Sequence, residues 1–191
     1  MELSKESSLL IENYATVEEI FRCQVELDTE LQTILFGLDQ LCKDQAWWTQ
    51  EWKFHAYRVD QVYITNTKWH LAGEGSALWL GVDKFNASHL FGLSPCPTLY
   101  LWVESSRGPA LTKELLKLIE QDKLPGKEYA DNGRGQFVIK RPLTRCSEDE
   151  AHRFPGGVLA EVVAFFSEYA ANEETLSGAV SRTLGGSPSR G

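Results

Sequence analysis

The stretch Glu51-Trp52-Lys53 contains residue types that could support hydrolysis at a metal ion. When an acidic residue lies two positions before a lysine, its carboxylate can join an upstream carboxylate in holding Mg²⁺, and the lysine can help to position the attacking water. Asp44, or Asp39 before it, would supply the second carboxylate. A metal-dependent nuclease or related hydrolase using Asp44, Glu51 and Lys53 is therefore one of two functions that we consider.

The remaining chemistry-bearing residues follow no recognised spacing. The four histidines have neither an HxH nor an HExxH pattern, so the sequence predicts no metal site; they are His55, His70, His89 and His152. No serine lies in a Gly-x-Ser-x-Gly turn, and Gly133-Arg134-Gly135 matches neither common phosphate-binding loop. We expect no cofactor and interpret the glycine-rich segments as turns.

Tryptophan is unusually frequent, and three of the six tryptophans fall within six positions. Trp47, Trp48 and Trp52 could form an aromatic surface for a protein partner, because tryptophan is enriched where proteins bind one another. They could equally fill the junction between the first predicted helix and the sheet that follows it. The three tryptophans are the candidate partner-binding residues of the sequence.

The longest periodic pattern predicts a helix from Thr16 to about Lys43. Apolar residues recur at alternating three- and four-residue spacing, with Gln24 as the one polar interruption; they are Val17, Ile20, Leu27, Leu31, Ile34, Leu38 and Leu41. Thr16 and Glu19 have the spacing of a capping box at the helix start. Phe21 and Leu35 broaden the stripe, which favours packing across a sheet of the same domain. A homodimer formed through this helix is the competing interpretation.

The rest of the chain alternates strand-like and helix-like segments. Strand formers are concentrated at 57–65, 77–82, 98–103 and 136–140, and helical patterns follow at 109–124 and 157–171. The predicted fold is α+β, with a mainly antiparallel sheet of four to five strands packed by the long N-terminal helix and two later helices. The central strands are so hydrophobic that we expect helices on both sheet faces. We expect one domain at 1–171 and a disordered tail at 172–191, where residues are small and polar.

The net charge of −8 argues against nucleic acid as the partner, since a sequence-independent binder needs basic surface. Four cysteines without a CxxC pair, and an N-terminal stretch unlike a secretory signal, predict free thiols in the cytoplasm. No apolar run reaches the ~18–20 residues needed to span a bilayer. The preferred function is a non-enzymatic protein-interaction or regulatory module, whose partner is another protein or a second copy of the chain.

Overall fold

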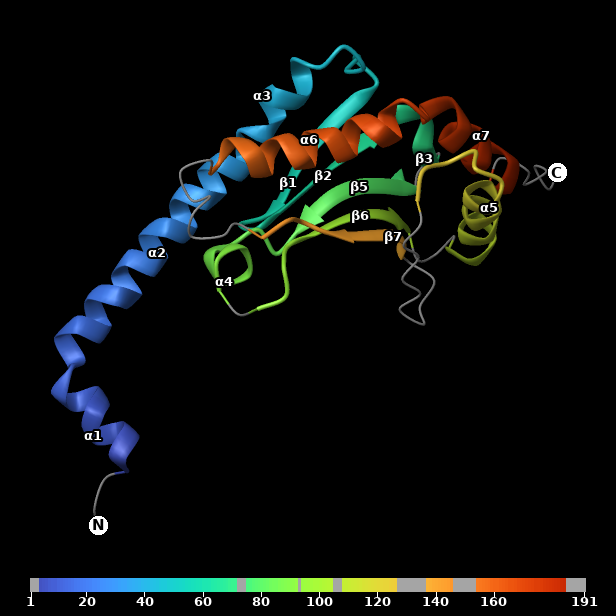
Figure 1. The fold of residues 1–191 in the computed structure, drawn as a ribbon. Coiled ribbons are helices and arrows are strands. Elements are labelled where there is room, and N and C mark those ends of the chain that lie inside the picture. Colours follow the sequence, from blue (N-terminus) through green and yellow to red (C-terminus); the bar gives the residue numbers. More distant parts are fainter. Residues whose placement is uncertain are drawn as a thin grey trace.

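The computed structural model describes residues 4–71, 75–92, 94–104, 108–126, 137–145 and 154–184. The elements in chain order are α1 (Lys5–Glu12), α2 (Tyr14–Phe36), α3 (Leu38–Lys43), β1 (Trp52–Arg58), β2 (Gln61–Asn66), the 3₁₀ turn η1 (Thr67–Trp69), β3 (His70–Leu71), β4 (Gly75–Ser76), β5 (Leu78–Asp83), α4 (Ala87–Leu90), β6 (Thr98–Val103), α5 (Gly108–Glu120), β7 (Phe137–Pro142), α6 (Gly156–Ala170) and α7 (Glu173–Leu184). The predicted α+β class is confirmed (Figure 1).

The main sheet has five antiparallel strands in the order β1-β2-β5-β6-β7, and β3 and β4 form a separate short pair. The strand register aligns aliphatic residues into rows that cross the sheet. One such row is completely buried or nearly so, and it consists of Ile64, Leu80, Leu101 and Ile139. Residues paired directly across neighbouring strands point to the same face, so all members of a row lie on the same side of the sheet.

Helices cover that aliphatic side. Figure 1 shows α6 and α3 lying along one face of the sheet, and α3 also contacts α6. The buried residues of α6 recur at helical spacing, as the sequence predicts, and they include Val158, Val162, Phe165, Phe166 and Tyr169. The core therefore lies between one sheet face and these helices.

The opposite sheet face is not covered as expected, because the sequence predicted helices on both faces. Within the described residues, no helix lies across it in Figure 1. Instead, each of its five strands carries a half-buried ring that contacts the ring on the neighbouring strand. We call these residues the aromatic row, which consists of His55, Tyr63, Trp79, Trp102 and Phe137. Aromatic side chains are large enough to shield a sheet face without a second helical layer.

A glycine in the central strand makes the packing of this face possible. Gly81 lies opposite both Tyr63 and Tyr100 in the sheet register. Tyr100 lies so close over Gly81 that an added Cβ would meet its hydroxyl oxygen at 2.3 Å. The Gln61 side chain donates a hydrogen bond of 3.1 Å to that hydroxyl, so the tyrosine spans from β6 across β5 to β2. Burial raises the pKa of the Tyr100 hydroxyl.

The N-terminal helix begins earlier than the predicted capping box at Thr16, and that prediction is wrong. Ser4 caps α1 by accepting a hydrogen bond of 3.1 Å from the Ser7 amide, and α2 begins at Tyr14 after an interruption at Asn13. A second interruption at Gly37 separates α2 from α3. The predicted single helix is therefore two helices, α2 and α3, which the separate α1 precedes, and its C-terminal part packs on the domain.

The predicted strand at 57–65 is only partly correct, because residues 61–65 belong to β2 whereas residues 57–60 form the end of β1 and the turn of a β-hairpin. β1 and β2 pair antiparallel on either side of Val59 and Asp60, with an irregular register near Ala56 and Arg58. The sequence lacks a glycine or asparagine at this turn, so the usual hairpin signal is missing.

The predicted disordered tail at 172–191 is wrong for residues 173–184, which form α7. This helix packs against α5, and it buries Leu176, Ala179 and Val180. Three small or medium apolar residues at helical spacing give enough burial to order a segment that is otherwise polar. Residues 185–191 and the segments containing Gly133, Cys146 and His152 lie outside the described residues. Among the described helices, none is both long and apolar enough to cross a bilayer.

Candidate functional site

The three residues of the hydrolase hypothesis are placed on separate elements. Asp44 ends α3 and accepts a hydrogen bond of 2.8 Å from the Gln40 side chain. Glu51 immediately precedes β1, and its carboxylate lies 3.2 Å from the Lys68 ammonium. Lys53 is exposed on β1. Each of the two carboxylates thus already has a protein partner.

Lys68 is the centre of a small ion-pair network around Glu51. Its ammonium also lies 3.1 Å from the Glu173 carboxylate at the start of α7. The hydrogen bonds that the Lys68 ammonium donates to the carboxylates of Glu173 and Glu51 raise its pKa. The network ties β1 and η1 to α7. In the described part of the chain, no group of three His, Cys, Asp or Glu side chains is arranged to hold a metal ion.

The structure brings Trp47, Trp48 and Trp52 together at the junction of α3, β1 and α6. The ring centroid of Trp47 lies 5.6 Å from that of Trp48 and 5.3 Å from that of Trp52. Trp52 is 4% exposed and contacts the fully buried Trp69 edge to face at 5.2 Å, a fourth member that the sequence did not indicate. The Trp47 indole donates a hydrogen bond of 2.7 Å to the Ser167 hydroxyl on α6. Trp47 and Trp48, which are half-buried, retain surface for a partner.

The aromatic row on the opposite sheet face is closed by its own stacking. Tyr63 stacks between His55, at 4.7 Å and 21°, and Trp79, at 4.9 Å and 11°. Both faces of the Tyr63 ring are therefore occupied, which removes the free ring face that a nucleic-acid base would need. Burial lowers the pKa of His55, helped by the nearby His70, and burial raises the pKa of Tyr63.

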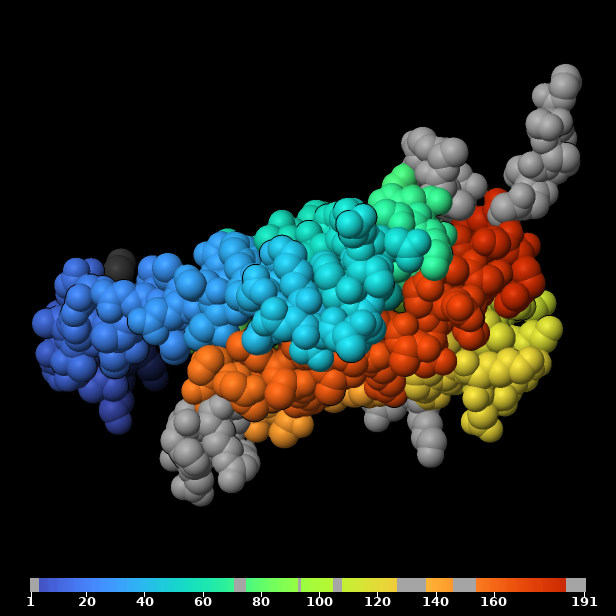
Figure 2. Space-filling model, turned by 90° about the horizontal axis from the view of Figure 1, so that it is seen from above, coloured from blue at the N-terminus to red at the C-terminus, as the bar shows by residue number. Residues whose placement is uncertain are grey.

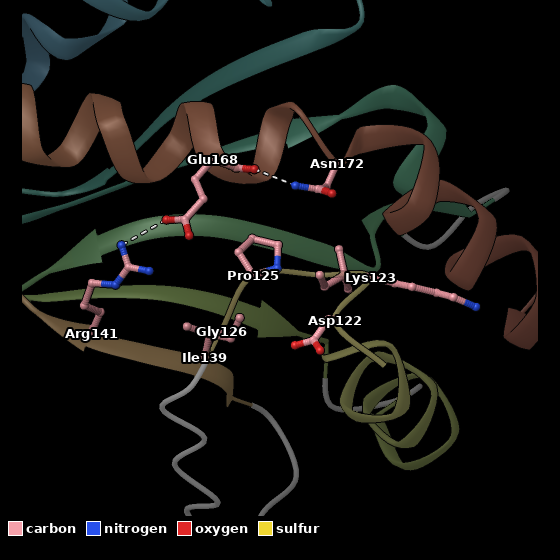
Figure 3. A pocket seen from close by; sticks show the side chains of 9 residues that line it. Asp122, Lys123, Pro125, Gly126, Ile139, Arg141, Glu168 and Asn172 are labelled. Carbon is pink, nitrogen blue, oxygen red and sulfur yellow. Dashed lines mark hydrogen bonds and ion pairs between the residues drawn. The ribbon is translucent and has the colours of Figure 1, made fainter. Parts of the chain in front are cut away.

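A hollow of about 620 Å³ lies between the end of α5, β7 and α6 (Figure 3). Figure 3 shows Arg141 and Glu168 pointing toward one another, and an ion pair of 3.0 Å joins them. The Tyr169 hydroxyl donates a hydrogen bond of 2.9 Å to the Pro125 carbonyl at the same edge. Among the described residues that line it, there is no serine, cysteine or histidine. Its polar contacts hold α6 to the segment after α5.

A different surface stands out at the N-terminal end of the molecule. Residues 5–27, here called the arm, comprise α1 and the first half of α2. Figures 1 and 2 show the arm extending away from the sheet and its covering helices. Seven large apolar side chains of the arm are between 50% and 66% exposed, and these are Leu9, Leu10, Ile11, Tyr14, Ile20, Phe21 and Val25.

The arm joins the body at Asp28. The Asp28 carboxylate accepts a hydrogen bond of 2.8 Å from the Ala87 amide at the start of α4. Beyond this point Leu31 and Leu35 are completely buried, whereas α1 contains no buried residue. Of the predicted seam, Ile20 is thus exposed and Val17 is half-buried in the arm, whereas Leu31 and Leu38 are part of the core. Leu41, at the C-terminal end of the seam, is 38% exposed.

The apolar pattern of the sequence indicated this surface, but it could not show where along the helix burial stops.

Comparisons of the chain with protein-family models, with curated proteins and with solved structures find no match. Function is therefore argued from the geometry of this chain alone.

Proposed function

We propose that the chain is a non-enzymatic protein-interaction module of the cytoplasm and that the arm is its binding surface. The observation that supports the proposal is the exposure of seven large apolar side chains between Leu9 and Val25. Free thiols at Cys23, Cys42 and Cys96 support a reducing compartment.

The exposed area is large for a surface without a partner. Large apolar side chains offer roughly 150–200 Å² each, so seven that are about 60% exposed present about 700 Å² in total. The largest apolar patch of a typical monomer is about 300–600 Å², and it is often functional. An arm that serves only to connect elements would have polar residues at these positions.

The arm also lacks the packing that normally stabilises a helix. α1 has eight residues and no buried side chain. Isolated helices shorter than about 12–15 residues are marginal in water, because nucleation costs more than a few hydrogen bonds return. A partner that covers the apolar side chains would supply the missing stabilisation.

Photo-crosslinking in the cells that produce the protein tests this proposal. A photoreactive phenylalanine analogue replaces Phe21 in one variant and the exposed Lys113 in a control. Lys113 lies on α5, which Figure 1 shows at the opposite end of the molecule. We expect adducts at position 21 and none at position 113.

Two results would contradict the proposal. The first is the absence of any protein adduct at position 21. The second concerns the non-enzymatic character: cleavage of nucleic acid by the purified protein with Mg²⁺ or Mn²⁺, abolished by Glu51→Ala, would support the hydrolase instead.

A further inference from the structure

The exposed side of the arm continues the buried side of the same helix. Leu31 and Leu35 are completely buried against the domain. At about 100° of rotation per residue, Val17, Ile20 and Gln24 lie on the same side of α2 as these two leucines. The side of α2 that forms the core at its C-terminal half thus continues into the arm, with Gln24 as its polar interruption.

Three charged residues of the arm, Glu19, Arg22 and Glu26, lie on a different side of α2 from Leu31 and Leu35. Arg22 pairs with Glu19 and, at 3.2 Å, with Glu26. These three residues lie roughly opposite Gln24 around the helix. Two copies of the arm can therefore meet along this side without bringing the carboxylates of Glu19 and Glu26 together, although the whole chain carries a net charge of −8.

The area available matches what a dimer requires. The seven exposed side chains of the arm offer at most about 700 Å² of apolar surface, which approaches the ~800 Å² per partner of standard interfaces only when the pairing covers all of them. Gln24 adds a specific feature, because a single polar residue within an apolar helix seam fixes the register and number of paired helices at some cost in affinity. A second copy of the chain is therefore sufficient to cover the exposed apolar side chains of the arm.

We propose that two copies of this chain associate by pairing their arms, with Ile20, Phe21 and Gln24 in the shared interface. This inference rests on the proposed function and identifies the partner as a second copy. The interface leaves the sheet and its covering helices outside the contact, so each protomer keeps its own core.

Sedimentation equilibrium of the purified full chain tests the inference. We expect a dimer for the wild type and for Ala15→Glu, which adds a carboxylate to the exposed side of the arm away from the stripe. We expect a monomer for the double variant Ile20→Glu/Phe21→Glu, with the dimer dissociation constant raised at least 100-fold. Ile20 and Phe21 are 60% and 62% exposed, so the variant keeps its core and its near-ultraviolet circular dichroism. Gln24→Leu should tighten the dimer by about tenfold.

The outcomes separate the two proposals. A wild type that stays monomeric at all concentrations overturns the inference, and so does a dimer that survives Ile20→Glu/Phe21→Glu. If adducts with a different protein still form at position 21, the proposed function stands while self-association fails. If no adducts form either, both fail.

Discussion

Replacing Gly81 with alanine tests the packing of the uncovered sheet face most sharply. The new Cβ would lie 2.3 Å from the Tyr100 hydroxyl oxygen, 2.4 Å from its Cζ and 2.8 Å from the Val62 carbonyl oxygen. The carbonyl belongs to the neighbouring strand and cannot move aside cheaply. Overpacking of this kind costs about 1–3 kcal/mol, and displacing Tyr100 also loses its hydrogen bond with Gln61, worth about 1 kcal/mol.

The expected loss in the free energy of unfolding is therefore about 2–3 kcal/mol, after allowing for the lower backbone entropy of alanine in the unfolded chain. Urea denaturation at one fixed protein concentration, followed by tryptophan fluorescence, measures it. The control is Gly157→Ala in α6, where no atom lies within 4 Å of the added Cβ and a gain of about 0.5–1 kcal/mol is expected.

A double variant shows whether the clash has the proposed cause. Truncating the ring in Tyr100→Leu removes the two nearest contacts and leaves the contact with the Val62 carbonyl, so Gly81→Ala should cost less in that background than in the wild type. If Gly81→Ala unfolds within about 0.5 kcal/mol of the wild type, Tyr100 does not lie over Gly81 and the account of this face is refuted.

Three further predictions concern other parts of the fold. Burial lowers the pKa of His55 in the folded state, so the unfolded state binds the proton more readily. The free energy of unfolding should therefore fall as the pH drops below about 6.5, and His55→Gln should reduce that fall. Burial and the nearby Asp39 raise the pKa of the Cys42 thiol to about 12. Iodoacetamide at pH 8 should therefore alkylate the exposed Cys23 well before Cys42 in the native protein, as measured by peptide mass spectrometry. Equal rates of alkylation would contradict the burial of Cys42. Leu176→Ala should cost about 2–4 kcal/mol in urea denaturation, because Leu176 is completely buried in α7, whereas a disordered tail would tolerate it without loss.

Periodicity predicted the parts of the fold in which each element buries one face. The sheet, α5 and α6 follow from apolar spacing that the structure confirms. The hairpin at Val59 and Asp60 was missed because its turn lacks the usual residues, and α7 was missed because its few buried residues are diluted by polar ones. In both cases tertiary contacts supply what local sequence does not.

The candidate site was only partly predictable for a related reason. The sequence contains one apolar seam, and a seam has the same pattern whether it contacts a sheet of its own chain or another helix. Leu31 belongs to the core and Ile20 to the arm, although both are part of one periodic pattern. Only the position of the sheet beneath α2 decides where burial ends.

Hydrogen exchange of the arm amides at two protein concentrations tests the central claim most directly. An unpaired arm is a marginal helix whose amides exchange rapidly, whereas a paired arm is protected. We expect residues 14–27 to be protected at high concentration and to lose protection on dilution, and we expect Ile20→Glu/Phe21→Glu to exchange rapidly at both. Exchange of the purified wild-type arm that is equally fast at both concentrations would contradict the claim that two arms pair.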